Sequence, residues 1–242
     1  MLAAGVALVA LLYSCVGHGG ASGYLALLAL LGHDPAQMKG AALLLNILVA
    51  GLAFLSYWRE GHFDAAIFWP LAAASIPLAF LGGLWRLPAS AYSLLLASVL
   101  AFAAFRLLMP DRHLGPEASQ APRIPHSLAA GGSIGLLSGL VGVGGGIFLS
   151  PLMILRRWAD PKTTAGVCAA FIWVNSLAGL YGHLSRGGVG GLSLWPLAAA
   201  AAAGGAAGSA FGARRLDTAW LRRLLAVVLM IACYKLLRVA LR

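Results

Sequence analysis

The sequence predicts an all-α polytopic membrane protein made of two four-segment repeats. Of its 242 residues, 61% are hydrophobic and only 10% are charged, and the mean hydropathy is +0.88. A soluble domain carries roughly 25% charged residues, so this chain has too few to cover a water-facing surface. The apolar residues form long runs, with room for roughly eight segments of about 20 residues each. No strand-like alternation appears, and an open sheet would leave backbone groups unpaired in lipid, so we expect helices.

Each half of the chain contributes four apolar runs. In the first half they cover residues 2–31, 38–58, 64–84 and 90–109. In the second half they cover residues 127–156, 163–184, 191–213 and 218–241. The first run of each half is too long for one simple span and contains a glycine cluster, whereas the other runs have ordinary spanning lengths. We therefore expect a broken or re-entrant first segment in each half.

Short motifs recur at a constant spacing in the two halves. The pairs, each offset by 126 residues, are Asp34-Pro35 with Asp160-Pro161 and Trp69-Pro70 with Trp195-Pro196. Such a long period suits a duplicated transporter rather than a soluble array of short repeats. We predict a first membrane repeat over residues 1–109, a polar linker over 110–126 and a second membrane repeat over 127–242.

The basic residues predict the topology. If the two interrupted runs turn back within the membrane, one side receives clearly more Lys and Arg than the other, and positive-inside bias places that side in the cytoplasm. Each half then crosses three times, and the halves are inverted repeats. The alternative, in which all eight runs cross, gives no orientation signal and stays open. The richer side holds Arg59, the 110–126 linker, Arg156, Arg157, Lys162 and the Arg214–Arg223 cluster.

The net charge of +10 does not indicate a nucleic-acid partner. Most of the 17 Lys and Arg residues lie in loops and at segment ends, where they orient the chain and contact lipid headgroups. The chain begins without a basic stretch, so we interpret its start as the first membrane segment rather than a signal peptide. The expected location is the cytoplasmic (inner) membrane of a bacterium, and a homo-oligomer stays open.

Several motifs are absent from the sequence. No phosphate-binding loop and no metal-ligand spacing of His, Cys or carboxylates is present, so we expect no metal, no cofactor and no enzymatic activity. Every Asp and Glu lies in a loop or at a segment end, which argues against a buried carboxylate relay or a cation site. Three cysteines inside apolar runs, Cys15, Cys168 and Cys233, are expected to be unpaired.

The two glycine clusters predict an anion site. They read Val16-Gly17-His18-Gly19-Gly20-Ala21 and Val141-Gly142-Val143-Gly144-Gly145-Gly146. An unwound turn frees backbone N–H groups, glycine lets a ligand approach them, and the next half-helix presents its positive N-terminus. The alternative is that these glycines only allow close helix packing in lipid. The candidate substrate-binding residues are Gly17, His18, Gly19, Gly20, Ser22, Asn46, Ser138, Gly142, Gly144, Gly145, Gly146 and Asn175.

Polar side chains add detail to this hypothesis. Ser14, Ser22 and Ser138 could donate hydroxyl hydrogens to the anion. His18 stands where the second cluster has Val143, and it could bind the anion or carry a coupled proton. Alternatively, it is a neutral imidazole hydrogen-bonded to a carbonyl. Asn46 and Asn175, in the second run of each half, either line the path or join helices by hydrogen bonds. We expect four aromatic side chains to be interfacial anchors: Tyr57, Trp58, Trp69 and Trp195.

The second cluster also carries a family resemblance. The stretch Gly135–Ile147, followed by Pro151-Leu152, resembles the signature of the TauE/SafE sulfite exporter family. The Gly204–Gly208 run and the closing Leu221–Leu225 are similar to the same family's second half. The resemblance implies secondary transport of sulfite, sulfonates or related sulfur-containing anions, often as export. It covers nearly the whole chain.

The first half departs from this pattern, and several functions stay open. His18 lies inside the motif, and Ser14-Cys15 replaces Gly139-Leu140. A polarizable thiol near the site makes thiosulfate or a sulfide-like species a conceivable cargo. Our main interpretation is a secondary exporter of sulfite or organosulfonate, proton-linked or driven by the anion gradient. The alternatives are an uptake carrier for thiosulfate or another anion, a passive anion channel, and a membrane enzyme or assembly subunit. No nucleophile–base pair supports an enzyme.

Overall fold

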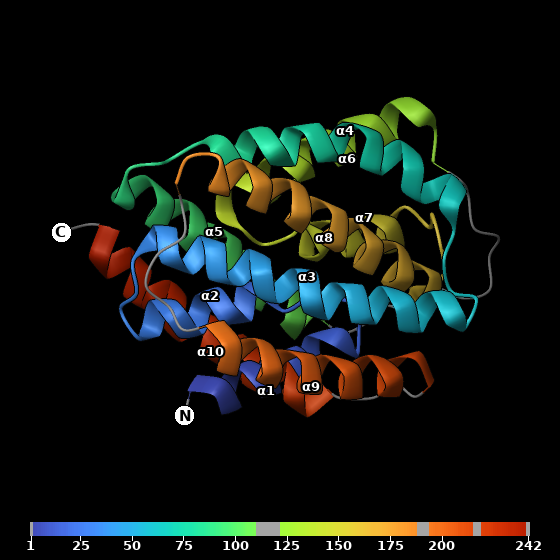
Figure 1. The fold of residues 1–242 in the computed structure, drawn as a ribbon. Coiled ribbons are helices and arrows are strands. Elements are labelled where there is room, and N and C mark those ends of the chain that lie inside the picture. Colours follow the sequence, from blue (N-terminus) through green and yellow to red (C-terminus); the bar gives the residue numbers. More distant parts are fainter. Residues whose placement is uncertain (1, 110–121, 188–193, 215–218, 241–242) are drawn as a thin grey trace.

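The structure is a computed structural model that describes residues 2–109, 122–187, 194–214 and 219–240, and within these ranges the regular elements are ten α-helices (Figure 1). In the first half they are α1 (Leu2–Ser14), α2 (Ala21–Leu30), α3 (Pro35–Arg59), α4 (Ala65–Leu84) and α5 (Ala89–Leu108). In the second half they are α6 (Ile124–Val141), α7 (Gly146–Leu155), α8 (Pro161–Leu184), α9 (Leu194–Arg214) and α10 (Ala219–Ala240). The predicted all-helical fold is confirmed.

The helices follow the predicted apolar runs closely. Residues 15–20 separate α1 from α2, and residues 142–145 separate α6 from α7, so both glycine clusters do interrupt helices. α6 begins at Ile124 because Pro125 fits the first turn of a helix, where no backbone N–H is needed. The last three residues of the predicted linker are therefore helical. Residues 110–121 of that linker lie outside the described ranges.

Six of the described helices are long and apolar enough to cross a membrane: α3, α4, α5, α6, α8 and α9. Three others, α1, α2 and α7, are apolar but shorter. The six long helices include α6, which we placed in a re-entrant segment, and do not include α10, which we expected to cross. Length and composition thus support a polytopic membrane protein, and the number of crossings stays a prediction.

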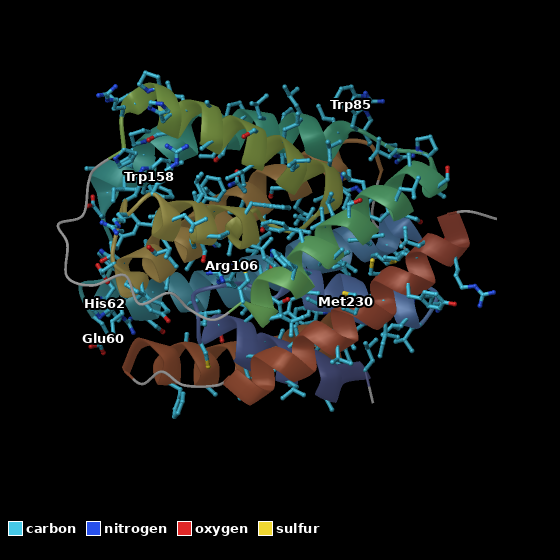
Figure 2. All side chains as sticks on the ribbon, turned by 180° about the vertical axis from the view of Figure 1, so that it is seen from behind. Glu60, His62, Trp85, Arg106, Trp158 and Met230 are labelled. Carbon is cyan, nitrogen blue, oxygen red and sulfur yellow. The ribbon has the colours of Figure 1, made fainter. Side chains whose placement is uncertain are left out.

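The bundle has two ends, which we call the His62 end and the Trp85 end after residues that lie at opposite ends in Figure 2. α3 runs from the Trp85 end to the His62 end, and α4 returns. Gly166, near the start of α8, lies against the His62 carbonyl, and Gly182, near its other end, lies against Phe80. α8 is therefore antiparallel to α3 and begins at the His62 end.

The broken segment α6–α7 has both of its ends at the His62 end. α6 lies parallel to α4, because glycines at every fourth position of α6 approach the α4 backbone in order. The contacts are Gly131 with Leu71, Gly135 with Ser75, and Gly139 with Ala79. A Cβ on any of these glycines would overlap the opposing backbone, so the small residues let the two helices approach closely. α6 thus starts at the His62 end, and α8, which follows α7, starts there too.

The broken segment α1–α2 has both of its ends at the Trp85 end. α9 runs beside α3 toward the His62 end, where the hydroxyls of Ser209 and Ser56 lie 3.1 Å apart. α1 is parallel to α9, again through glycines at every fourth position. The contacts are Gly204 with Ala7, Gly208 with Leu11, and Gly212 with Cys15. α1 therefore starts at the Trp85 end, and α3, which follows α2, starts there as well. The two broken segments enter the bundle from opposite ends.

Candidate functional site

The first break ends α1 and begins α2. Gly17 and Gly20 have φ angles of +72° and +92°, in the left-handed region that favours glycine. The His18 N–H donates to the Tyr13 carbonyl at 2.9 Å, which closes the last turn of α1. Gly20 is the N-cap of α2 and, as a glycine, makes no side-chain capping bond. The first N–H groups of α2 therefore face the break.

The second break repeats part of this backbone, and its Gly144 also has a positive φ, +82°, which the matching Gly19 does not have. Gly142 and Gly145, which stand 125 residues after Gly17 and Gly20, have φ angles of +87° and +86°. The Gly142 N–H donates to the Ser138 carbonyl at 2.8 Å and ends α6. Gly145 is the N-cap of α7 and likewise makes no side-chain capping bond. Close packing alone does not require these positive φ angles, so at these positions glycine has a conformational role as well.

The two breaks meet at Asn46. This residue is the twelfth of the 25 in α3 and is fully buried. Its Nδ2 donates to the Val143 carbonyl at 3.2 Å and to Ser176 Oγ at 3.4 Å, and it lies 2.6 Å from the position that a Cβ would occupy on Gly144. A Cβ on Gly19 would overlap Asn46 Oδ1. One amide in the middle of the bundle therefore has the first break on its oxygen side and the second break on its nitrogen side.

His18 reaches from the first break to the second. Its Nδ1 lies 2.8 Å from the Val16 carbonyl, which can only accept, so Nδ1 carries the hydrogen. The ring Cδ2 lies 3.6 Å from the position of a Cβ on Gly146, the first residue of α7. The carbonyl hydrogen bond of our alternative interpretation is thus present. A second proton, if the imidazole takes one up, goes to Nε2.

Polar atoms without hydrogen-bond partners gather around the breaks. Four fully buried groups have no partner among the residues that the structure describes: Asn46 Oδ1, both amide atoms of Asn175, Ser138 Oγ and Tyr24 Oη. A buried polar atom without a partner is destabilising by roughly 1–3 kcal/mol, so one such group invites a functional explanation and several together do so more strongly. A bound ligand or ordered water would satisfy them.

These groups surround both turns. The position of a Cβ on Gly145 lies 2.9 Å from the ring of Phe171 and 3.5 Å from Ser138 Cβ. Asn175 follows Phe171 by one turn of α8, so it lies on the same face. At the first break, Tyr24 Oη lies 2.8 Å from the corresponding position on Gly20. The partnerless atoms therefore belong to the same region as the glycine turns.

Two of the predicted hydroxyl donors already have partners. Ser22, in the first turn of α2, lies with its Oγ 2.7 Å from Tyr13 Oη. Ser14 donates to the Ala10 carbonyl at 2.7 Å, within its own helix. Of the three serines that the sequence pointed to, Ser138 is the one whose hydroxyl has no partner in the described residues.

Two tyrosines support the breaks, and neither role was predicted from the sequence. We expected Tyr57 to be an interfacial anchor, which is wrong: its side chain is 2% exposed, and its hydroxyl donates to the Cys15 carbonyl at 2.9 Å. Tyr92, from α5, donates to the Val141 carbonyl at 3.0 Å. A carbonyl that is freed where a helix ends therefore receives a tyrosine hydroxyl at each break.

A buried lysine lies against the second break. Lys39, in the first turns of α3, is 4% exposed, and its Nζ donates to the carbonyls of Gly82 and Gly83 at 3.2 and 3.3 Å. Its Cγ lies 3.1 Å from the position of a Cβ on Gly142. We expected basic residues near segment ends to be surface groups, but the fold brings the end of α4 beside the start of α3 and encloses Lys39.

The chemistry of the region is electropositive. The described residues hold no group of three or more His, Cys, Asp or Glu side chains that could bind a metal ion. Helix N-termini at α2 and α7 carry partial positive charge, and Lys39 adds a cation nearby. Amide and hydroxyl groups complete the surroundings. Such an arrangement can bind a small anion without a metal.

Comparison with known proteins agrees with this description. The sequence profile of the family "Sulfite exporter TauE/SafE" matches residues 2–236. The "Probable membrane transporter protein y4hK" of Sinorhizobium fredii (strain NBRC 101917 / NGR234) is 34% identical to this chain over 233 residues, which cover 95% of this chain and 94% of that protein. No solved structure matches significantly.

Proposed function

The chain belongs to the sulfite exporter TauE/SafE family of membrane transporters, and we propose that it exports small sulfur-containing anions, sulfite or an organosulfonate, from the bacterial cytoplasm. Membership shows an integral membrane transporter rather than an enzyme. The cargo, the direction and the cytoplasmic-membrane location are the proposed parts.

The observation that carries the proposal is the meeting of the two breaks at Asn46. In the proposed site the anion lies between the turns, where it accepts hydrogen bonds from N–H groups at the starts of α2 and α7. Ser138 Oγ and an amide hydrogen of Asn175, both without partners in the described structure, supply further donors. Asn46 Oδ1 and Asn175 Oδ1 are acceptors, so they suit ordered water or an anion that retains a proton, such as hydrogen sulfite.

The proposed transport cycle uses two inverted repeats, residues 1–109 and 127–242, on either side of the site. The basic residues Arg59, Arg156, Arg157 and Lys162 lie near the His62 end, which positive-inside bias assigns to the cytoplasm. The α6–α7 segment would then re-enter from the cytoplasm, and α1–α2 from the outside. Rocking of one half against the other would expose the anion alternately to each side.

His18 is the proposed proton carrier. It is an ionisable side chain inside the bundle, and its ring lies between the two breaks. A proton on Nε2 would add positive charge where the anion binds, so anion and proton movement would be coupled.

Flux from proteoliposomes tests the function. The purified protein is reconstituted, the vesicles are loaded with radiolabelled sulfite, methanesulfonate or thiosulfate, and release is followed with and without a pH gradient. We expect release of sulfite or the sulfonate that responds to the gradient. Release of thiosulfate alone would reassign the cargo, and release that never responds to any gradient would indicate a passive channel. No release from folded protein would contradict the proposed cargo class.

A further inference from the structure

We propose that Lys39 supplies the positive charge that balances the anion bound at the second break. The inference deepens the proposed function and rests on it. It assigns a charge-balancing residue to a site in which backbone groups provide the direct contacts. It also explains why a cation is buried in a chain whose carboxylates lie elsewhere.

Lys39 and Asn46 lie on the same face of α3, because they are seven residues, or nearly two turns, apart. Both contact the second break: Asn46 through the Val143 carbonyl, and Lys39 through packing of its Cγ against Gly142. Three bonds separate that Cγ from Nζ. The ammonium group is thus held close to the turn, on the Trp85 side of Asn46.

The contacts of Lys39 leave its charge uncompensated. Its two hydrogen bonds go to neutral carbonyls, and no carboxylate of the described chain forms an ion pair with it. A buried charge that lacks a charged partner is strongly destabilising, and such groups are normally paired. An anion in the second break would be that partner, since Gly142 lies directly against the lysine side chain.

A second lysine, Lys235, also caps the end of a helix, but it does so away from both breaks. Lys235 of α10 donates to the Leu30 carbonyl at 2.7 Å, at the end of α2, as Lys39 does at the end of α4. Lys235 is only half-buried, and its bond is at the far end of α2 from the first break. It therefore serves as a matched control for the capping role alone.

The test compares anion binding by Lys39→Gln and Lys235→Gln. Glutamine can still donate to a carbonyl but carries no charge, and because its side chain is one bond shorter than that of lysine, Lys235→Gln controls for any loss of the cap. Binding is measured on the purified full-length protein by stabilisation against heat, with divalent thiosulfate and monovalent methanesulfonate as probes. Because the attraction scales with the charge of the anion, we expect Lys39→Gln to weaken methanesulfonate about tenfold and thiosulfate about a hundredfold. Lys235→Gln should bind both anions as the wild type does.

Each other result contradicts a different claim. Equal weakening of both anions in Lys39→Gln, or the same change in Lys235→Gln, would overturn the role of Lys39 and leave the transport function standing. A wild-type protein that binds neither anion would contradict the proposed function and, with it, this role. If Lys39→Gln does not fold, Lys39→Arg keeps the charge and should keep the wild-type preference between the two anions. A changed preference there would also overturn the assignment.

Discussion

The first break, residues 15–20, and the second break, residues 142–145, share positive φ angles at two matched glycine pairs, Gly17 with Gly142 and Gly20 with Gly145. They differ at the third pair, where Gly144 has a positive φ and Gly19 does not, and in the side chains around them. Gly20 and Gly145 are each the N-cap of a half-helix and have φ near +90°. The first break has His18 and a hydroxyl pair between Tyr13 and Ser22. The second is bordered by Ser138, the ring of Phe171 and the buried Lys39.

This difference separates two tasks. The helix N-termini at the two breaks lie near Asn46, and in the proposed site their N–H groups bind the anion. The differing side chains add an imidazole, His18, at the first break and a lysine, Lys39, at the second. We therefore attribute binding to the repeated backbone, proton coupling to the first break and charge balance to the second.

The largest expected effect comes from the shared glycines. Alanine at Gly20 or Gly145 would be strained at positive φ, and its Cβ would lie 2.8 Å from Tyr24 Oη or from Ile134 Cγ2. We expect both variants to lose sulfite flux in proteoliposomes. Gly61→Ala is the control: its φ is +78°, but nothing that the structure describes lies within 4 Å of the new Cβ. This control should be destabilised by roughly 1–2 kcal/mol and still transport. Equal flux in all three variants would show that the turns do not form the site.

A second large effect is expected at the amide between the breaks. Asn46→Leu has a similar volume but cannot donate to Val143 or face Gly19 with an acceptor. We expect the affinity for sulfite to fall roughly ten- to hundredfold, as when a buried hydrogen-bonding group is lost. Ser56→Ala, on the same helix, removes hydrogen bonds to Leu52 and Ser209 and should change sulfite affinity little. The comparison is made by titration of the purified variants, and a similar loss in both would refute the special role of Asn46.

Asn175 should show effects of opposite sign on stability and binding. Both of its amide atoms are buried without partners in the described structure, so leucine there removes an unsatisfied group. We expect Asn175→Leu to raise the free energy of unfolding by about 1 kcal/mol and to weaken sulfite binding about tenfold. Thermal melts with and without sulfite measure both quantities. A variant that is less stable and binds normally would make Asn175 a packing residue.

Replacing His18 is expected to change the coupling of sulfite transport to the pH gradient rather than the affinity for sulfite. Glutamine can still donate to the Val16 carbonyl but does not titrate. We expect His18→Gln to release sulfite at a rate within about threefold of wild type at neutral pH and to lose the response to a pH gradient. His62→Gln, outside the breaks, should keep that response. A wild-type pH response in His18→Gln would leave His18 as a structural residue.

The smallest effect on stability is expected at the N-caps of α3 and α8, which are the helices that follow the two broken segments. Asp160 caps α8 by accepting from the N–H groups of Lys162 and Thr163, whereas Asp34 makes no such bond at the start of α3 in the described structure. Burial opposes ionisation of Asp160, but the hydrogen bonds outweigh it and lower the pKa of its carboxyl. Its stabilisation is therefore present at neutral pH and lost as the pH falls through that lowered pKa.

We expect Asp160→Ala to lower the free energy of unfolding by up to about 1 kcal/mol and Asp34→Ala to lower it less. Melting temperatures measured from neutral to acidic pH test this pair. The gap between the two variants should close as the pH falls. A constant gap would show that the Asp160 cap does not depend on its charge.

Much of the fold follows from local sequence properties. Helix positions depend on hydropathy, and α3 and α8 begin within three residues of the predicted runs because proline fixes a first turn. The breaks at residues 15–20 and 142–145 also followed from glycine's conformational preference. Helix positions and helix breaks depend on residues that are close together in the chain, so they can be predicted from a single sequence.

The side-chain contacts of the site could not be predicted from the sequence, because they form between helices that are distant along the chain. Tyr57 and Lys39 lie near segment ends, where aromatic and basic residues normally meet lipid headgroups. They are buried because α8 and α4 lie across them, and this is a property of the tertiary packing. The pairing of Ser22 with Tyr13 likewise required α1 and α2 to fold against each other. Asn46 and Asn175 were noticed as polar residues, but only the fold places Asn46 between both breaks.

The central claim is that two breaks form a single anion site, and calorimetric titration of the purified protein with sulfite tests it most directly. We predict one anion per chain for the wild type, and no measurable binding by either Gly20→Ala or Gly145→Ala, although the two substitutions lie in different halves. Two anions per chain, with one retained in each variant, would mean that the breaks are separate sites and would contradict the account.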